Sequence, residues 1–425
     1  MVRIGRRRRA PAPDAPSVVV VGAGFAGLST LRALARGGLR VTLVDRHIYS
    51  TFQPLLYQVA TGGLNPGDVA YPVRSFTRKY GVRFRRGELA GIDTAARTVT
   101  LADGGRLGYD YLVIATGVSA AYFGIEGAEK YSRALYTRRD AITLRDHLMA
   151  GLEEMSIASE PTELVITVVG GGATGVEVAG TLAELRNIAL AAAFPEVDRA
   201  RVHIRLVELG PYLIPPFDAS LRDYAYRQLE KRGVDVRLGT TIREVTPDSV
   251  IVADGQSLHS DITVWGAGVS APAAAAHWGL PQGRNGRIVV GPDLRVKGQD
   301  RIFAVGDIAI AEQDPAPQLA QPALQEGRHA ARQVARLAAA QPTAPFRYHD
   351  KGIMATIGRR SAVVELPYRV RFGGTLAWLA WLGLHIIELL GNRNRFSTLL
   401  NLSWRYLTWA RGGGLIVGDD PPEEG

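Results

Sequence analysis

The sequence contains no cysteine among its 425 residues, and this absence limits the chemistry that the protein can perform. Disulfides, thiolate metal sites and thiol redox catalysis all require cysteine, so each of them is excluded. The eight histidines show neither an HxxH nor an HExxH spacing, and we therefore predict no metal site.

The sequence also lacks a strong charge of one sign outside its first residues. The formal net charge is +9, but five arginines lie within the first nine residues, so the remainder carries only about +4. A balance this mild argues against nucleic acid as a partner. Residues 1–16 are predicted to form a basic, solvated tail, although such arginines can also meet anionic lipid head groups.

No long hydrophobic run is present. The N-terminus has no apolar segment typical of a secretory signal. The longest apolar stretch, Thr375–Leu390, is short for a membrane span and contains His385 and Glu388. With 46% hydrophobic and 21% charged residues, the composition is that of a folded protein large enough for two or three domains.

A glycine loop near the N-terminus is typical of a dinucleotide site. SVVVVGAGFAG predicts a buried strand, a tight turn and the start of a helix. The three glycines allow the turn, the approach of a pyrophosphate, and close packing of helix on strand. Asp45, at the end of the next strand, is placed to accept ribose hydroxyls. The candidate residues are Gly22, Gly24, Phe25, Ala26, Gly27, Asp45 and Arg46.

The same pattern returns in ELVITVVGGGATGVEVAG, which predicts a second strand–turn–helix unit. Its acid is Glu208, which favours NADH because a carboxylate repels the 2′-phosphate of NADPH. Arg205 would favour NADPH, but it lies three residues away on a strand and points to the other face. The candidate residues for this nucleotide are Gly170, Gly172, Ala173, Thr174, Gly175 and Glu208.

Two dinucleotide sites in one chain suggest hydride transfer from a nicotinamide to a flavin. We therefore predict non-covalent FAD at the first loop and NADH, as substrate, at the second. The fold class is α/β, with two Rossmann-like domains. We expect a tail at 1–16, an FAD domain at 17–155 and 260–345, an inserted NAD domain at 156–259, and a C-terminal membrane-binding region at 346–425.

Beyond the glycine loops, the chain resembles the type II NADH:quinone oxidoreductases, which are non-proton-pumping NADH dehydrogenases of respiratory membranes. The resemblance runs from Ser17 to about Val417 and rests on FQPLLYQVATGGL, YDYLVIATG, FAVGDIA, AQPALQEG and KGIMATIGR. Glu326 departs from the family pattern, and we find no counterpart of a C-terminal lysine that some members carry; His385 and Arg393 are the only candidates.

The resemblance implies roles for residues outside the two loops. It implies that Asp307 and the turn Ala115, Thr116 and Gly117 bind FAD, together with Ala320 and Gln321. It implies that Gln321, Gln325 and Tyr57 line a quinone pocket. Gln321 and Gln325 could equally be amides on a half-exposed helix, and Tyr57 could serve packing. The backbone at Gly268, in VWGAG, either closely approaches the nicotinamide or the flavin or forms an ordinary turn between domains.

Glu177 is predicted to lie in the first turn of the helix that follows the second glycine loop. A carboxylate there is stabilised by the helix dipole whatever its function. The resemblance implies a catalytic role in hydride transfer or quinone protonation. A proton role would require a pKa raised by burial.

The composition of the C-terminal residues determines where in the cell we expect the protein to be. Two apolar helices carry Trp378, Trp381, Trp404 and Trp409, with arginines in and after the break between them (Arg393, Arg395, Arg405, Arg411). This composition is typical of an interfacial membrane anchor, although the helices could also form a homodimer face. We expect a peripheral protein on the cytoplasmic face of the cell membrane.

The predicted activity is transfer of hydride from NADH to FAD and of two electrons to a membrane quinone, without proton pumping. Thiol-disulfide and sulfide:quinone oxidoreductases of the same fold are excluded by the missing cysteines. Two alternatives stay open: a flavoprotein reductase of a protein acceptor, and a membrane-bound NADH and flavin redox sensor.

Overall fold

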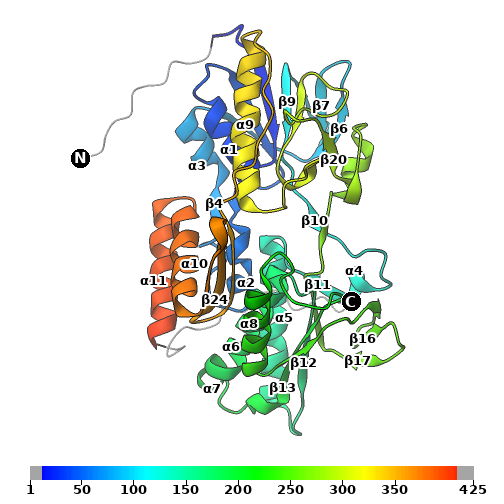
Figure 1. The fold of residues 1–425 in the computed structure, drawn as a ribbon, viewed down its shortest axis with the longest axis vertical. Helices are drawn as coiled ribbons and strands as arrows, with labels where there is room; N and C mark the ends of the chain where they lie inside the picture. Colours follow the sequence, from blue (N-terminus) through cyan, green and yellow to red (C-terminus); the bar gives the residue numbers. More distant parts are fainter. Residues whose placement is uncertain (1–11, 409–425) are drawn as a thin grey trace, which may run out of the picture. The chain divides into compact units, whose positions relative to one another are not determined.

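The computed structural model describes residues 12–408, the last four of them by their backbone only (Figure 1). Trp409, Arg411 and the basic residues 1–11 lie outside this range. Packing divides the chain into two units. Unit 1 is formed by the chain up to Ser50, Tyr71–Ser119 and Val269–Asp350; unit 2 is formed by Thr51–Ala70, Ala120–Gly268 and the chain from Lys351 onward. These units are defined by packing and not by ligands, so the nucleotide domains stay a prediction.

Unit 1 is built on a five-stranded parallel sheet in the order β21-β9-β1-β2-β5. Its central strand, SVVVV, is buried from its second residue onward, which explains the continuous valine run. The strands are β1 (Ser17–Val21), β2 (Arg40–Asp45), β5 (Arg83–Arg86), β9 (Tyr111–Ile114) and β21 (Ile302–Ala304). An antiparallel sheet and a short parallel pair complete the unit: β6 (Leu89–Asp93), β7 (Thr98–Leu101), β8 (Arg106–Gly108), β20 (Ile288–Val290) and β22 (Ala309–Ala311).

The helices of unit 1 are α1 (Phe25–Leu34), α3 (Val73–Tyr80) and α9 (Ala320–Ala338). Helices α1 and α9 lie side by side although almost 300 residues separate them (Figure 1). They approach closely at Gly327, where a side chain would overlap the Ala26 carbonyl oxygen. The Ser29 hydroxyl donates to the Leu324 carbonyl at 2.7 Å. This contact places the AQPALQEG helix beside the helix of the first glycine loop.

Unit 2 contains a second five-stranded parallel sheet, in the order β11-β18-β12-β13-β14. The strands are β11 (Ser132–Ala134), β12 (Leu164–Val169), β13 (Val202–Val207), β14 (Val234–Arg237) and β18 (Ile262–Trp265). Its helices include α2 (Leu56–Ala60), α4 (Ala128–Tyr131), α5 (Arg138–Ile157), α6 (Ala173–Glu184), α7 (Leu190–Ala193) and α8 (Ala219–Lys231). Two parallel sheets with helices confirm the predicted α/β class with two Rossmann-like units.

Two antiparallel sheets and two helices complete unit 2. The strands are β15 (Ile242–Val245), β16 (Ser249–Val252), β17 (Ser257–His259), β23 (Ile353–Gly358), β24 (Ser361–Leu366) and β25 (Val370–Gly373). The helices α10 (Thr375–Glu388) and α11 (Asn392–Thr408) follow. Four short strands lie where the chain passes between units: β3 (Tyr49–Thr51), β4 (Ala70–Pro72), β10 (Ser119–Ala120) and β19 (Val269–Ser270).

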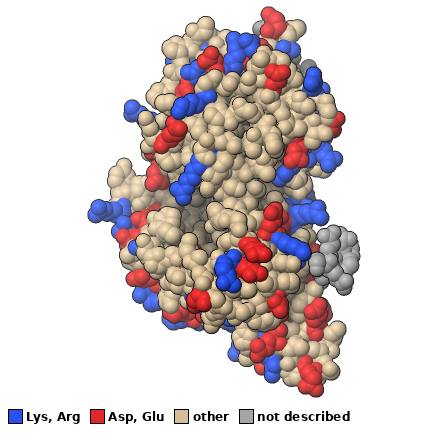
Figure 2. Space-filling model, turned by 90° about the vertical axis from the view of Figure 1, so that its right-hand side faces the viewer, with Lys and Arg blue, Asp and Glu red and all other residues tan. Residues whose placement is uncertain are grey.

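Charged residues of both signs are interspersed on the face of the molecule in Figure 2, with broad uncharged surface between them. No helix of the described residues is both long and apolar enough to cross a bilayer. Within residues 12–408 no cluster of three or more His, Asp or Glu side chains could hold a metal ion.

Candidate functional site

The first glycine loop has the geometry of an open phosphate cradle. Gly22 has φ +108° and donates its N–H to the Val44 carbonyl. A side chain at Gly27 would overlap the Gly22 carbonyl oxygen, so helix and strand meet there without room for a methyl group. At Gly24 a side chain would meet nothing within 4 Å, and no side chain caps the start of α1. A helix start that no described side chain caps presents backbone N–H groups that suit an anion.

Asp45 lies beside this loop, as the sequence predicted. Its carboxylate accepts from the Ala23 N–H at 2.6 Å and from the His47 N–H at 2.7 Å. Burial raises its pKa, and the two backbone donors oppose that shift. Arg46 is exposed and pairs with Glu88 at 3.3 Å, whereas Ala26 is buried in α1. The loop and its acid are thus arranged as a dinucleotide site requires.

The ATG turn adds an unsatisfied polar group to unit 1. Thr116 follows β9, and its hydroxyl is buried without a hydrogen-bond partner among the described residues. Ala115 lies so close to Gly22 that a side chain on the glycine would overlap the Ala115 carbonyl oxygen. Gly117 follows with φ +70°, a backbone conformation that allows the chain to turn. Because buried hydroxyls are rarely left without a partner, Thr116 fits a bound group that supplies one.

Two carboxyl groups lie close together at the GD turn. Asp307 follows Gly306, and burial raises its pKa to about 6 against the opposing charge of Arg287. Glu326, on α9, accepts from the Gly306 N–H at 2.6 Å, and burial with the nearby Asp307 charge raises its pKa to about 7. The sequence singled out Asp307 but treated Glu326 only as a departure. The hydrogen bond from Gly306 joins Glu326 on α9 to the GD turn, and no local sequence signal predicts this contact.

The two glutamines of α9 differ in their surroundings. Gln325 donates to the His349 carbonyl at 2.9 Å and accepts from the His349 N–H at 3.0 Å. Its amide is therefore engaged at both ends by backbone. Gln321, one turn earlier, is half-buried next to Ala320 at the start of the helix. Of the two, Gln321 fits a ligand-facing amide better, and the role of both stays a prediction.

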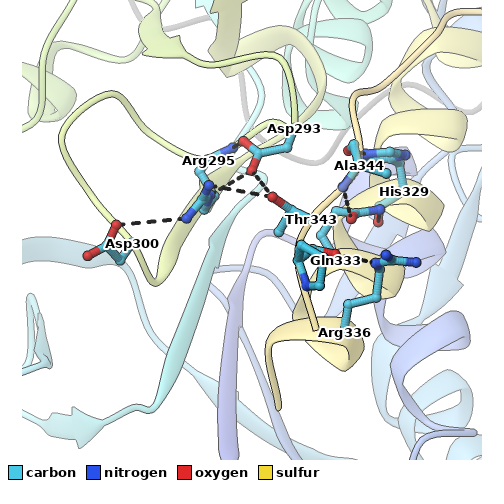
Figure 3. Close-up of polar contacts among 9 residues, drawn as sticks. Asp293, Arg295, Asp300, His329, Gln333, Arg336, Thr343 and Ala344 are labelled. Atoms are coloured by element: carbon cyan, nitrogen blue, oxygen red, sulfur yellow. Dashed lines mark hydrogen bonds and ion pairs between the residues drawn. The ribbon is translucent and has the colours of Figure 1, made fainter. Parts of the chain in front are cut away.

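His349 belongs to an extended strap, residues 341–349, that lies along α9 within unit 1. Ala344 is held between His329, at 2.9 Å, and Gln333, at 2.8 Å (Figure 3). Thr343 donates to Asp293 at 2.7 Å. These contacts fix the strap, so the engagement of Gln325 is part of a continuous series of hydrogen bonds.

The second glycine loop, in unit 2, repeats the geometry of the first. Gly170 has φ +104°, and a side chain at Gly175 would overlap the Gly170 carbonyl oxygen. Nothing lies within 4 Å of a side chain at Gly172, and no side chain caps α6. Ala173 and Thr174 are exposed in the first turn of that helix. This loop therefore has a second open helix end.

Glu208 borders the second loop, as predicted. Its carboxylate accepts from the Gly171 N–H and, at 2.6 Å, from the Gly210 N–H. Arg205 is directed elsewhere and pairs with Asp235 at 3.0 Å. Of these two charged groups, Glu208 contacts the glycine loop and Arg205 does not.

Gly268 packs against an aromatic ring. A side chain at this position, where φ is +155°, would overlap Phe123. Phe123 is 60% exposed and has φ +53°, a conformation that is strained for a bulky residue. The Trp265 indole N–H donates to the Ala121 carbonyl at 2.8 Å and so fixes the backbone two residues before Phe123. Sequence reasoning missed Phe123.

Glu177 lies in the second turn of α6, which begins at Ala173, so the prediction of the first turn was wrong. The helix dipole acts mainly within the first turn, and it is therefore a minor influence on this acid. The Thr356 N–H donates to Glu177 Oε1 at 3.3 Å, and the Trp381 side chain also donates to the carboxyl. Burial outweighs both donors and raises the pKa of Glu177 to about 8. At neutral pH the group is mostly protonated.

The C-terminal helices do not follow the tryptophan pattern that the sequence suggested. Trp378 and Trp381 face the interior of unit 2, with 9% and 2% exposure, and Tyr57 contacts Trp381 edge to face at 5.9 Å. Trp404 is exposed, as are apolar side chains of α10 and α11 (Leu376, Leu379, Leu384, Ile387, Phe396, Leu399 and Leu400). Arg393 and Arg395 are exposed at the break. The outward apolar surface is therefore made chiefly of leucines.

The polar face of α11 is fastened to the loop 61–70. Ser397 and Asn401 both donate to Asp68 at 2.7 Å, and Asn394 donates to the Ala70 carbonyl at 2.8 Å. These bonds fix the rotation of α11 and turn its apolar face outward.

Comparison with known proteins identifies the class and then the family. A family model described as pyridine nucleotide-disulphide oxidoreductase matches residues 16–327, and another, the NDH2 C-terminal domain, matches residues 350–408. The chain is 36% identical to the type II NADH:quinone oxidoreductase Ndh of Mycobacterium tuberculosis, over 94% of this chain and 90% of that protein. It is 32% identical to the type II NADH:quinone oxidoreductase of Staphylococcus saprophyticus, over 83% and 90%. The chain belongs to the type II NADH:quinone oxidoreductase family, which confirms the resemblance drawn from the sequence.

Solved structures agree on the fold. A structure of NDH2 from Plasmodium falciparum in complex with NADH superposes with a TM-score of 0.85 at 20% identity, and it covers 94% of this chain and 99% of that one. The two chains therefore share their fold over most of their length.

Proposed function

We propose that this protein is a non-proton-pumping NADH:quinone oxidoreductase that uses FAD. The observation that carries the proposal is the pair of open glycine loops, each with an uncapped helix end and a carboxylate at the end of the following strand. The relatives named above are NADH:quinone oxidoreductases, and the chain covers most of their length. FAD, when bound, accepts the hydride of NADH and passes two electrons to the quinone.

FAD is assigned to the loop of unit 1, where the open space at Gly24, the carboxylate of Asp45 and the orphaned hydroxyl of Thr116 fit its polar groups. Asp307 is proposed to bind the ribitol. With a pKa raised to about 6, this carboxyl gains from a hydroxyl donor that stabilises its charged form. The FAD domain is proposed to comprise 17–155 and 260–345.

NADH is assigned to the loop of unit 2, within a domain at 156–259. Glu208 is held beside the open helix end by two backbone donors, which fit a role in binding the ribose 2′-hydroxyl. A 2′-phosphate would lie against this carboxylate and be repelled. Gly268, against which the Phe123 ring packs, is proposed to border the nicotinamide.

Quinone reduction requires a proton. NADH supplies a hydride and the quinone takes up two electrons and two protons, so one proton comes from solution for each turnover. Glu177 is the proposed donor, because its pKa of about 8 keeps it protonated at neutral pH. Tyr57, which belongs to unit 2 as Glu177 does, is proposed to line the quinone pocket, and the role of Gln321 stays a prediction from the sequence.

The exposed apolar faces of α10 and α11 support peripheral attachment to a bilayer through the region 346–425. We propose the cytoplasmic side for this attachment. A quinone is itself a bilayer solute, and this makes a lipid surface the simplest occupant of the apolar face. The same face could join two copies of the chain, so liposome flotation of monomeric protein separates the two arrangements.

The test of the function is the flavin absorbance of purified protein during anaerobic addition of NADH and then of a short-chain quinone. We expect bleaching by NADH and recovery with quinone. Bleaching without recovery would refute quinone as acceptor and would favour a protein acceptor or a redox sensor. A protein that binds no flavin when FAD is added would refute the assignment of the first loop.

A further inference from the structure

Helix α6 packs closely on β23, and a side chain of helix α10 reaches Glu177 there. A side chain at Gly180 would overlap the Ile357 carbonyl oxygen, so α6 approaches the strand without room for a methyl group. This approach lets the Thr356 N–H reach Glu177. Helix α10 packs on the same hairpin and delivers Trp381, whose indole donates to the carboxyl. All of these residues belong to unit 2.

Trp381 itself is held on both sides. His385 stacks on its ring with centroids 4.0 Å apart, and His385 Nδ1 lies 2.6 Å from the Trp381 carbonyl oxygen. Tyr57 contacts the indole edge to face, and Phe52 contacts His385 in the same manner at 6.1 Å. The Trp381 side chain is only 2% exposed, and the rings packed against it restrict its orientation.

Among α2, α10 and β23, the titratable side chains are Tyr57 of α2 and His385 and the exposed Glu388 of α10, and β23 has none. Burial lowers the pKa of His385 to about 4, so the imidazole does not supply a cation. The indole N–H and the Thr356 N–H are therefore the local dipoles that orient the acid.

We propose that Trp381 is a positioning residue for quinone reduction, holding the Glu177 carboxyl in one orientation through its indole N–H while His385 holds the indole. This inference rests on the proposed function. In the step itself, the O–H bond of the Glu177 carboxyl breaks, the proton joins the reduced quinone oxygen, and the carboxylate regains a proton from water. An oriented acid transfers this proton more readily than one that samples several rotamers.

The substitution that isolates this role is Trp381→Phe, which keeps an aromatic ring and removes the N–H. Trp378→Phe is the matched control, because Trp378 is a second buried tryptophan on the same helix. Both variants are compared as FAD-loaded enzyme, with the thermal midpoint measured first. Flavin bleaching by NADH and recovery with short-chain quinone are then followed separately by stopped flow.

We expect Trp381→Phe to leave the NADH half-reaction within about twofold of wild type and to slow quinone-dependent recovery about tenfold. An N–H donated to a carboxylate stabilises the charged form, so its loss raises the apparent pKa of the recovery rate by about one unit. Trp378→Phe should change neither. In a Glu177→Gln background, Trp381→Phe should have little further effect, because the group it orients is gone.

Each outcome decides between explanations. A wild-type enzyme that quinone does not reoxidise overturns the proposed function, and this inference with it. A wild-type enzyme that turns over while Trp381→Phe behaves like Trp378→Phe overturns this inference alone. A slowed Trp381→Phe with an unchanged pH profile, or an equal loss in the Glu177→Gln background, also refutes it, since both indicate a structural effect that does not act through Glu177.

Discussion

Glu326 provides a direct test of the electrostatics in unit 1. Its side chain is 7% exposed and accepts from the Gly306 N–H, and its pKa is raised from 4.5 to about 7 by burial and the charge of Asp307. The folded state thus binds this proton more tightly than the unfolded chain does. As pH rises from 4.5 through 7, folding increasingly requires an unfavourable buried charge, and above pH 7 the cost is complete.

Glu326→Gln removes the ionisation and keeps an oxygen for the Gly306 N–H. Raising the pKa of Glu326 from 4.5 to about 7 corresponds to about 3 kcal/mol. Most of this difference, about 2.5 kcal/mol, develops between pH 5 and pH 8.5. The variant should therefore differ from wild type by less than about 1 kcal/mol near pH 5 and become more stable toward pH 8.5. For a unit of about 180 residues, the gain is about 5–10 °C in midpoint.

The assay is thermal unfolding at a fixed scan rate across this pH range, with excess FAD so that flavin occupancy is equal. Glu312→Gln is the control, because Glu312 is an exposed carboxylate of the same unit that pairs with Lys297. The control should show no comparable pH-dependent gain. A difference between Glu326→Gln and wild type that is constant with pH, or that favours wild type as pH rises, would refute the reasoning.

Three further predictions follow from the loops and the C-terminal helices. Gly27→Ala should yield protein without bound flavin, because the methyl group overlaps the Gly22 carbonyl oxygen; a yellow, flavin-loaded variant would contradict the assignment. Glu208→Gln should lower the preference for NADH over NADPH about tenfold in steady-state kcat/KM, and an unchanged ratio would remove the ribose role. The double substitution Leu379→Glu and Leu400→Glu, at side chains 53% and 51% exposed, should abolish flotation with liposomes while retaining NADH-dependent bleaching. Continued flotation would assign membrane binding elsewhere.

The sequence predicted those parts of the site that depend on neighbouring residues. A strand, a glycine turn and a helix follow one another locally, and the acid closes the next parallel strand, so Asp45 and Glu208 could be placed from spacing alone. The valine run of β1 is likewise a local signal of burial on both sides of a sheet.

The environment of Glu177 could not be predicted in the same way. Its partners, Thr356 and Trp381, are about 180 and 200 residues away, and only the seating of α6 on β23 brings them together. The segment TLAWLAWLGLHIIELL is apolar around most of its circumference, so periodicity does not show which side faces inward. The buried positions of Trp378 and Trp381 therefore emerged only from the structure, as did the engagement of Gln325 by His349.

The interleaved order of the two units has a consequence for how the protein is made. In unit 1, β9 pairs with β21, and α1 packs against α9, which is synthesised almost 300 residues later. In unit 2, α6 is covered by β23 near the end of the chain. Neither unit can close its core while the ribosome is still translating the middle of the message. Because such long-range pairing is slow, the nascent chain exposes apolar strands for much of its synthesis. We therefore expect its yield to depend on chaperone capacity more than on the stability of the finished enzyme.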